Sequence, residues 1–122
     1  MALKVLDTKE QLQELLSSDT DRLFILKLGA TWCAPCKDAH PAFEALSIEA
    51  SLQNRNTTCV VINKTDENES LFEEHEITKL PTFILFQYGE MKAKIPRPNP
   101  DELTRIMEPY LPCPALVLDE DF

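Results

Sequence analysis

Apolar side chains recur along this chain with two different spacings, and the change of spacing separates strands from helices. Residues 22–30 (RLFILKLGA) and 57–63 (TTCVVIN) are almost continuously apolar or β-branched, which is typical of strands covered on both faces. Residues 8–18 carry leucines at helical spacing, and Thr8 and Gln11 occupy the two positions of a capping box. The pattern therefore predicts a helix followed by two central strands.

The rest of the chain continues this alternation. The other expected elements are a strand at 3–6, a helix from residue 33 to about residue 52, a short helix at 67–76, two hairpin strands at 82–87 and 91–95, and a final helix from residue 100. Pro41 lies inside the second helix and should kink it. Asn99 and Glu102 should form a capping box for the last helix. The buried face of that helix is expected to carry Leu103, Ile106, Met107 and Tyr110.

The resulting order of elements is β-α-β-α-β-α-β-β-α. The alternating part requires parallel strands joined by helical crossovers, and the final hairpin adds an antiparallel edge. The predicted fold class is therefore α/β, a three-layer α/β/α sandwich with a mixed central sheet. A chain of 122 residues is long enough for one such domain. We expect the domain to span residues 1–110 and a C-terminal tail to span residues 111–122.

Charge and hydropathy exclude two classes of partner. The chain has 21 acidic and 12 basic residues and a net charge of −9, whereas nucleic-acid binding needs clustered basic side chains that neutralise phosphates. No apolar run is long enough for a signal peptide or a membrane span. The sequence therefore predicts a cytoplasmic protein that binds neither nucleic acid nor membranes.

Cysteine usage narrows the chemistry. The four cysteines are Cys33, Cys36, Cys59 and Cys113. In a reducing cytosol such a set indicates metal or redox chemistry rather than a disulfide framework. A structural zinc site needs a second close cysteine pair or closely spaced histidines, but Cys59 and Cys113 are 54 residues apart, and His40 and His75 are isolated. We therefore expect redox chemistry, with no metal and no other cofactor.

The segment WCAPCK, residues 32–37, closes a predicted strand and opens a predicted helix. The free N–H groups and positive dipole end of a helix stabilise an anion, so Cys33 should ionise more readily than a free thiol. Two intervening residues put Cys36 within reach of Cys33, and Pro35 stiffens the turn. An isolated CxxC also suits a metal knuckle, but its place in a βαβ pattern favours redox chemistry. Cys33 is then expected to attack a disulfide and Cys36 to resolve the mixed disulfide.

On these residues the sequence resembles thioredoxins. WCAPCK is similar to the active-site hexapeptide of that family, with Ala34 where glycine is commonest, and LPTF at 80–83 resembles its cis-proline segment. Pro41 matches the kinking proline, and Phe86 and Gly89-Glu90 match the following strand and turn. The resemblance covers about residues 3–110. It implies the thioredoxin fold and a protein-disulfide reductase recharged by a thioredoxin-reductase-like electron donor.

The resemblance also implies a substrate-binding surface around the cysteines. Pro81 should be cis and lie against the pair, and the backbone before it, at Leu80, should pair with the substrate polypeptide. Ala34 and Pro35 should line the same surface. Trp32 is expected either to form part of this contact surface or to serve as a packing aromatic.

Two positions depart from the family pattern. Six residues before Cys33, where most thioredoxins have a buried aspartate that relays a proton, the chain has Lys27. Two roles for Lys27 are open: a lysine with a buried stem and a solvated head, or a group that modulates the cysteines. Arg97 occupies the place of a loop glycine beside the active site, where it should make the lip of the groove bulky and cationic and change substrate choice.

The tail, LPCPALVLDEDF, extends beyond the family's final helix. Three expectations are open for it: disorder, packing on the body of the protein, or use as a docking peptide. Cys113 is most simply a free thiol. A regulatory bridge to Cys59 is the alternative, which the expected burial of Cys59 in a strand disfavours.

The leading functional hypothesis is a dithiol reductant of protein disulfides. The alternative is a thioredoxin-fold interaction or assembly module with little turnover. Lys27 and Arg97 favour the module, whereas the intact cysteine pair with Pro81 opposes it. An oxidase or isomerase of a secretory compartment is disfavoured because the sequence has no signal peptide.

Overall fold

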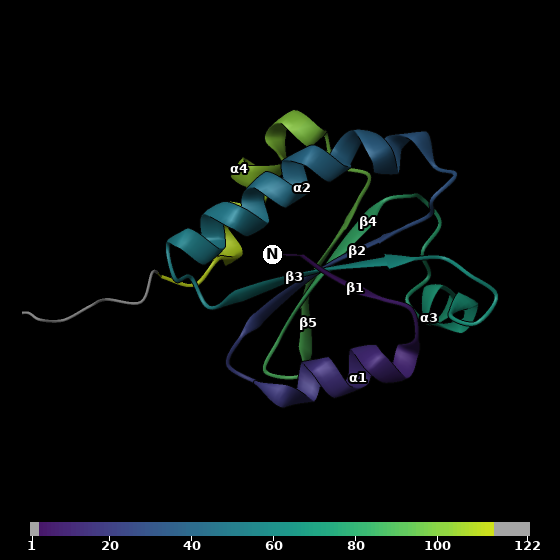
Figure 1. The fold of residues 1–122 in the computed structure, drawn as a ribbon, viewed down its shortest axis with the longest axis horizontal. Helices are drawn as coiled ribbons and strands as arrows, with labels where there is room; N and C mark the ends of the chain where they lie inside the picture. Colours follow the sequence, from purple (N-terminus) through teal and green to yellow (C-terminus); the bar gives the residue numbers. More distant parts are fainter. Residues whose placement is uncertain (1–2, 114–122) are drawn as a thin grey trace, which may run out of the picture.

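A five-stranded sheet forms the centre of the computed structural model, which describes residues 3–113 (Figure 1). In spatial order its strands are β1 (Leu3–Leu6), β3 (Thr57–Asn63), β2 (Leu23–Gly29), β4 (Thr82–Gln87) and β5 (Glu90–Pro96). The first three run parallel, and β4 and β5 are each antiparallel to their neighbours. This is the mixed sheet that the alternating pattern predicts.

Helices cover both faces of this sheet (Figure 1). They are α1 (Lys9–Ser18) and α3 (Glu69–Glu74) on one face, and α2 (Ala34–Leu52) and α4 (Leu103–Met107) on the other. The two large clusters of the core accordingly lie one on each face. On the α2 face, Phe43 packs edge-to-face against Phe83 of β4, with ring centroids 5.1 Å apart. The predicted three-layer α/β/α sandwich is confirmed.

The strand β2 lies at the middle of the sheet, between β3 and β4. All of its residues are buried, as the continuous apolar run predicts. Lys27 sits in this strand, with Val61 of β3 and Phe83 of β4 as its register partners. The chain leaves β2 at Gly29 and starts α2 at Ala34, so the CxxC segment lies at the carboxyl end of the central strand.

The capping box at the start of α1 is confirmed, since the Thr8 hydroxyl accepts from the Gln11 N–H and the Gln11 side chain accepts from the Thr8 N–H. Pro41 lies inside α2 as expected. The strands at 57–63 and 82–87 have their predicted bounds.

The final helix differs from the prediction. Short 3-10 turns, Pro100–Glu102 and Glu108–Tyr110, flank the five residues of α4. Asn99 caps the first turn by accepting from the Asp101 N–H, but the Glu102 carboxylate pairs with Arg105, so no capping box forms. Pro109 has no N–H to continue the α-helical bonds. Leu103 and Met107 are buried as expected and Ile106 is half-buried, but Tyr110 is exposed.

Asn68 joins three segments that the sequence pattern did not connect. It is 0% exposed. Its Nδ2 donates to the carbonyls of Asp7 (3.0 Å) and Asn63 (2.9 Å), and its Oδ1 accepts from the Thr65 N–H at 2.8 Å. The side chain thereby ties the ends of β1 and β3 to the loop before α3, and it makes no capping bond to the helix that it precedes.

Replacement of Asn68 by alanine should lower the free energy of unfolding by about 3 kcal/mol, because three hydrogen bonds worth about 1 kcal/mol each are lost from a completely buried side chain. Chemical denaturation monitored by circular dichroism measures this change. Asp66, which is exposed in the same loop, provides the control, and Asp66→Ala should change stability by less than about 0.5 kcal/mol. Equal effects of the two substitutions would contradict this role for Asn68.

Candidate active site

The sulfur of Cys33 forms the cap of α2. Cys33 has an extended backbone and precedes the first helical residue, and its Sγ accepts the N–H of Cys36 at 3.2 Å. Helix starts leave N–H groups without intrahelical partners, and these groups carry the positive end of the helix dipole. Negative charge on the Cys33 sulfur is therefore stabilised by the backbone of the same helix.

Cys36 lies behind Cys33 and is 3% exposed. Burial, and secondarily its hydrogen bond with Cys33, raise the pKa of the Cys36 thiol to about 11. Gly29 makes room for it, since a Cβ at this glycine would stand 2.9 Å from the Cys36 Sγ. Cys33 is also buried, at 6% exposed, but the pair is asymmetric in its chemistry. The Cys33 sulfur accepts a helix N–H, whereas the Cys36 thiol has a raised pKa and stays protonated at neutral pH.

The segment around Pro81 lies against this pair, although it is far away in sequence. The Leu80–Pro81 peptide bond is cis, as the resemblance implies. The Leu80 carbonyl oxygen is 3.7 Å from the Cys33 Sγ, and the Leu80 side chain packs on a small cluster formed by Ala30 and the two cysteines. The structure therefore brings Cys33, Cys36, Leu80 and Pro81 together.

The residues beside Cys33 form a rim. Trp32 is 72% exposed, so it does not serve as a packing aromatic. Ala34 is also exposed and Pro35 is half-buried. These three residues adjoin Cys33 in the chain, and the Leu80 carbonyl lies near its sulfur. A partner that approaches the Cys33 sulfur would therefore contact the three residues and the Leu80–Pro81 segment.

Within residues 3–113, no group of three or more His, Cys, Asp or Glu side chains could hold a metal ion. No helix in the same range is long and apolar enough to cross a membrane.

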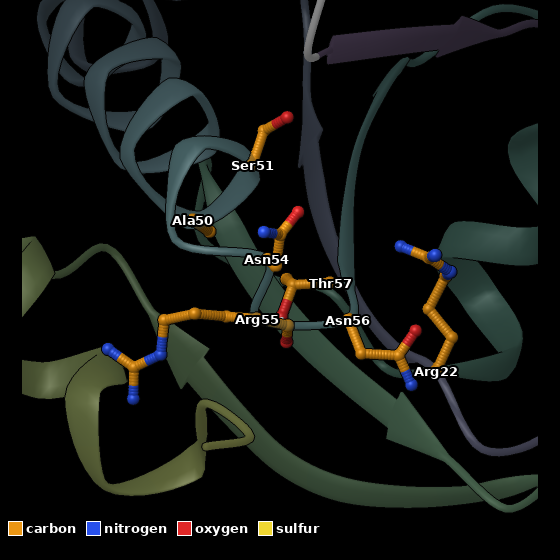
Figure 2. A pocket seen from close by; sticks show the side chains of 7 residues that line it. All are labelled: Arg22, Ala50, Ser51, Asn54, Arg55, Asn56 and Thr57. Carbon is orange, nitrogen blue, oxygen red and sulfur yellow. The ribbon is translucent and has the colours of Figure 1, made fainter. Parts of the chain in front are cut away.

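A cavity of about 480 Å³ lies at the other end of the central strands, around the starts of β2 and β3 and the end of α2 (Figure 2). In Figure 2 the Arg55 side chain extends to the left and the Arg22 side chain extends upward. Both side chains donate hydrogen bonds. Arg22 donates to the Thr58 hydroxyl, and Arg55 donates to the Pro112 carbonyl. No cysteine lines this cavity, so it is separate from the candidate active site.

Comparison with known proteins identifies the architecture. The family model described as Thioredoxin matches residues 3–109. The chain belongs to the thioredoxin family. Rabbit thioredoxin (Oryctolagus cuniculus) is 31% identical over 101 residues, which cover 83% of this chain and 91% of that protein. Mouse thioredoxin domain-containing protein 8 (Mus musculus) is 35% identical over 88 residues, 72% of this chain but 65% of that protein, just under two thirds of its length.

Solved structures show the same fold. Thioredoxin f2 of Chlamydomonas reinhardtii superposes with a TM-score of 0.78 at 26% identity, covering 88% of this chain and 95% of that one. The Fasciola hepatica thioredoxin superposes with a TM-score of 0.76 at 25% identity, covering 87% and 97%. The thioredoxin family and fold are consistent with a thiol–disulfide oxidoreductase.

Lys27, the first departure from the family pattern, is buried below the cysteines. It is 4% exposed, so the expectation of a solvated head is wrong. Its Nζ lies 3.5 Å from Nδ1 of His40, which is half-buried one helical turn after Cys36. Burial lowers the pKa of Lys27, while the nearby sulfurs of Cys36 and Cys33 oppose this shift. His40 is far from the other histidine in sequence, but its spacing of four from Cys36 indicates a shared helix face.

Arg97, the second departure, covers the backbone beside Pro81. Its φ of 39° lies in the left-handed region that favours glycine, which fits its place in the family pattern. Its backbone N–H donates to the Pro81 carbonyl at 2.8 Å, and its Nε donates to the Leu80 carbonyl at 3.0 Å. The Arg97 guanidinium is therefore hydrogen-bonded to the same Leu80 carbonyl oxygen that lies 3.7 Å from the Cys33 sulfur.

The other two cysteines lie apart from this arrangement. Cys59 is 1% exposed in β3, and burial raises its pKa to about 12, whereas Cys113 is exposed; both are free thiols. The start of the expected tail lies on the body, since Leu111 packs on the α2-side core and Arg55 donates to the Pro112 carbonyl. The remainder of the tail, 114–122, lies outside the described residues.

Alkylation should reveal the difference between the thiols. Iodoacetamide reacts with thiolates, so modification of Cys36 and Cys59 should accelerate about tenfold per pH unit between about pH 8 and pH 10, below their raised pKa values. Peptide mapping by mass spectrometry under reducing conditions measures the modification rate at each cysteine. Cys113, which is exposed, gives the rate of a thiol that is not buried. A Cys36 rate that levels off below about pH 9 would contradict the raised pKa.

Proposed function

We propose that this chain is a protein thiol–disulfide oxidoreductase that reduces substrate disulfides through the Cys33/Cys36 dithiol. The observation that carries the proposal is the asymmetry of the pair. The Cys33 sulfur accepts a helix N–H at 3.2 Å, and Cys36 lies buried behind it as a protonated thiol. A nucleophile needs a stabilised thiolate, and a resolving thiol needs to remain protonated until the mixed disulfide has formed.

In the proposed reaction, the Cys33 thiolate attacks one sulfur of the substrate disulfide and forms a mixed disulfide, while the other substrate sulfur leaves as a thiolate. Cys36 then attacks Cys33 and releases the second substrate sulfur. Two electrons pass from the dithiol to the substrate. A reductase similar to thioredoxin reductase would return the Cys33–Cys36 disulfide to the dithiol, and we propose the cytoplasm as the place of this cycle.

We propose that the substrate polypeptide lies across Cys33 between two walls. Trp32, Ala34 and Pro35 form one wall, and Leu80 and Pro81 form the other. The substrate backbone would pair with the peptide groups at Leu80. This surface belongs to the proposed domain of residues 1–110, with the tail of 111–122 outside it.

Insulin reduction with dithiothreitol tests the proposal. The natural protein should precipitate insulin chains, and Cys33→Ser should be inactive because it lacks the nucleophile. Cys36→Ser should accumulate mixed disulfides with substrate, visible by mass spectrometry. Cys113→Ser, at an exposed cysteine apart from the pair, is the matched control and should keep full activity. An inactive natural protein, or trapping by Cys33→Ser instead, would overturn the proposal.

One observation favours the second candidate, an interaction or assembly module with little turnover. The Arg97 Nε donates to the Leu80 carbonyl, the group that would accept from a substrate backbone. A substrate must displace this bond before it pairs there. Arg97 would then restrict which polypeptides reach Cys33, and a stronger restriction would leave a binding protein rather than a reductase.

Replacement of Arg97 by glycine should raise kcat/KM for insulin reduction about fivefold, because the substrate no longer displaces a charged hydrogen bond worth about 1 kcal/mol at an exposed site. Glycine also suits the φ of 39° at this position. Arg105→Ala removes the same charge from α4 and should leave kcat/KM unchanged. Unchanged kinetics of Arg97→Gly would show that Arg97 does not restrict access.

A further inference from the structure

Three exposed basic residues adjoin the Cys33 sulfur, and we call them the basic cluster: Lys37, Lys79 and Arg97. Lys37 lies at the start of α2, and its backbone N–H donates to the Cys33 carbonyl at 3.2 Å. Lys79 directly precedes Leu80, whose carbonyl oxygen lies 3.7 Å from the Cys33 Sγ. Arg97 donates to that same carbonyl through its Nε at 3.0 Å. Three separate segments of the chain therefore bring positive charge to the proposed nucleophile.

The charges of the basic cluster are not neutralised by carboxylates within the chain. Among residues 3–113, none of the ion pairs includes a member of the cluster. The first turn of α2 contains no acidic residue. The hydrogen-bond acceptor of the Arg97 Nε is an uncharged carbonyl, so the guanidinium keeps its full charge at an exposed position. A partner that approaches Cys33 would meet this charge.

The basic cluster contrasts with the overall charge of the chain, which has 21 acidic and 12 basic residues. The segments that meet at Cys33 are 30–38, 75–83 and 94–99. Their charged residues are Lys37, Lys79, Lys94 and Arg97, and the carboxylates Asp38 and Glu76. Lys94 donates to the Glu76 carbonyl at 3.1 Å, so these two opposite charges belong to neighbouring residues. Because salt limits the reach of exposed charges to about 8 Å under physiological conditions, the local excess of positive charge acts on a bound polypeptide more strongly than the net charge does.

Substrate binding would release the Arg97 guanidinium from its acceptor. The proposed substrate backbone pairs with the peptide groups at Leu80, which requires the Arg97 Nε to leave the Leu80 carbonyl. A guanidinium can donate two parallel hydrogen bonds to a carboxylate, and such charged bonds are stronger than a bond to a neutral carbonyl. An acidic side chain on the substrate would therefore replace the bond that is lost, whereas a basic side chain would be repelled.

We propose that the substrates of this site are polypeptides with acidic side chains beside the reacting cysteine, recognised by Lys37, Lys79 and Arg97. This inference rests on the proposed oxidoreductase function and adds a class of substrate to it. Arg97 then has two effects. It disfavours every polypeptide through the hydrogen bond that must break, and it favours acidic polypeptides through the ion pair that forms afterwards. Lys37 and Lys79 contribute attraction alone.

A set of matched peptides tests this preference. Each peptide has one intramolecular disulfide and the same sequence, except that the two neighbours of its first cysteine are aspartates, asparagines or lysines. Reduced protein in excess is mixed with each peptide, the reaction is stopped with acid, and mass spectrometry follows the loss of the disulfide. Charged neighbours also change the reactivity of the disulfide itself, so each rate constant is divided by the rate constant with dithiothreitol.

After this division, the natural protein should reduce the aspartate peptide about tenfold faster than the lysine peptide, with the asparagine peptide between them, since an exposed charge pair contributes up to about fivefold. Arg97→Gly, and the double variant Lys37→Gln with Lys79→Gln, should each lower this ratio about threefold. All three substitutions together should bring the ratio to about one. The bond between Arg97 and the Leu80 carbonyl slows all peptides alike, so it cancels in the ratio.

Lys4→Gln is the matched control, because Lys4 is an exposed lysine of β1 that is also absent from the ion pairs among residues 3–113. It should leave the ratio unchanged. Raising sodium chloride from about 0.05 M to about 0.5 M should lower the ratio of the natural protein, because salt screens exposed charges.

Equal normalised rates for the three peptides, or a faster lysine peptide, would overturn the preference for acidic substrates. A ratio that persists in the triple variant, that Lys4→Gln lowers as strongly, or that does not respond to salt would overturn the role of the basic cluster. Failure of the natural protein to reduce any of the peptides would instead overturn the proposed oxidoreductase function itself.

Discussion

The start of α2 must find acceptors for backbone N–H groups that have no partner within the helix, and the Cys33 sulfur is one of these acceptors. This requirement fixes the position of the sulfur at the carboxyl end of the central strand β2. The Leu80–Pro81 segment lies against it from another part of the chain, and Cys36 lies behind it. The same bond therefore caps a helix and sets the charge environment of the proposed nucleophile.

Much of this arrangement follows from local sequence. The continuous apolar runs predicted the buried strands, because this pattern depends on neighbouring residues. The approach of the LPTF segment to WCAPCK was implied only by the resemblance to thioredoxins. The features that the sequence did not predict are those that depend on contacts between segments far apart in the chain. Asn68 forms hydrogen bonds to three segments at once, and the spacing of apolar residues along the sequence does not reveal these bonds. The burial of Lys27 and its contact with His40 depend on how α2 lies over the sheet.

The two departures from the family pattern act on the site from opposite sides. Lys27 lies within the core below the cysteines, where its charge affects the thiols and their protons. Arg97 lies at the surface, where its guanidinium contacts the Leu80 carbonyl. One position thus lies next to the thiols, and the other lies next to the backbone of the proposed substrate surface.

The contact between Gly29 and Cys36 links two positions that are seven residues apart in the chain. A Cβ at residue 29 would stand 2.9 Å from the sulfur of Cys36, closer than such atoms approach in proteins. Backbone freedom is not the reason for this glycine, since the constraint comes from space alone. A larger residue at position 29 would therefore require the Cys36 side chain to shift. The space at residue 29 and the position of the Cys36 sulfur are thus set by one another.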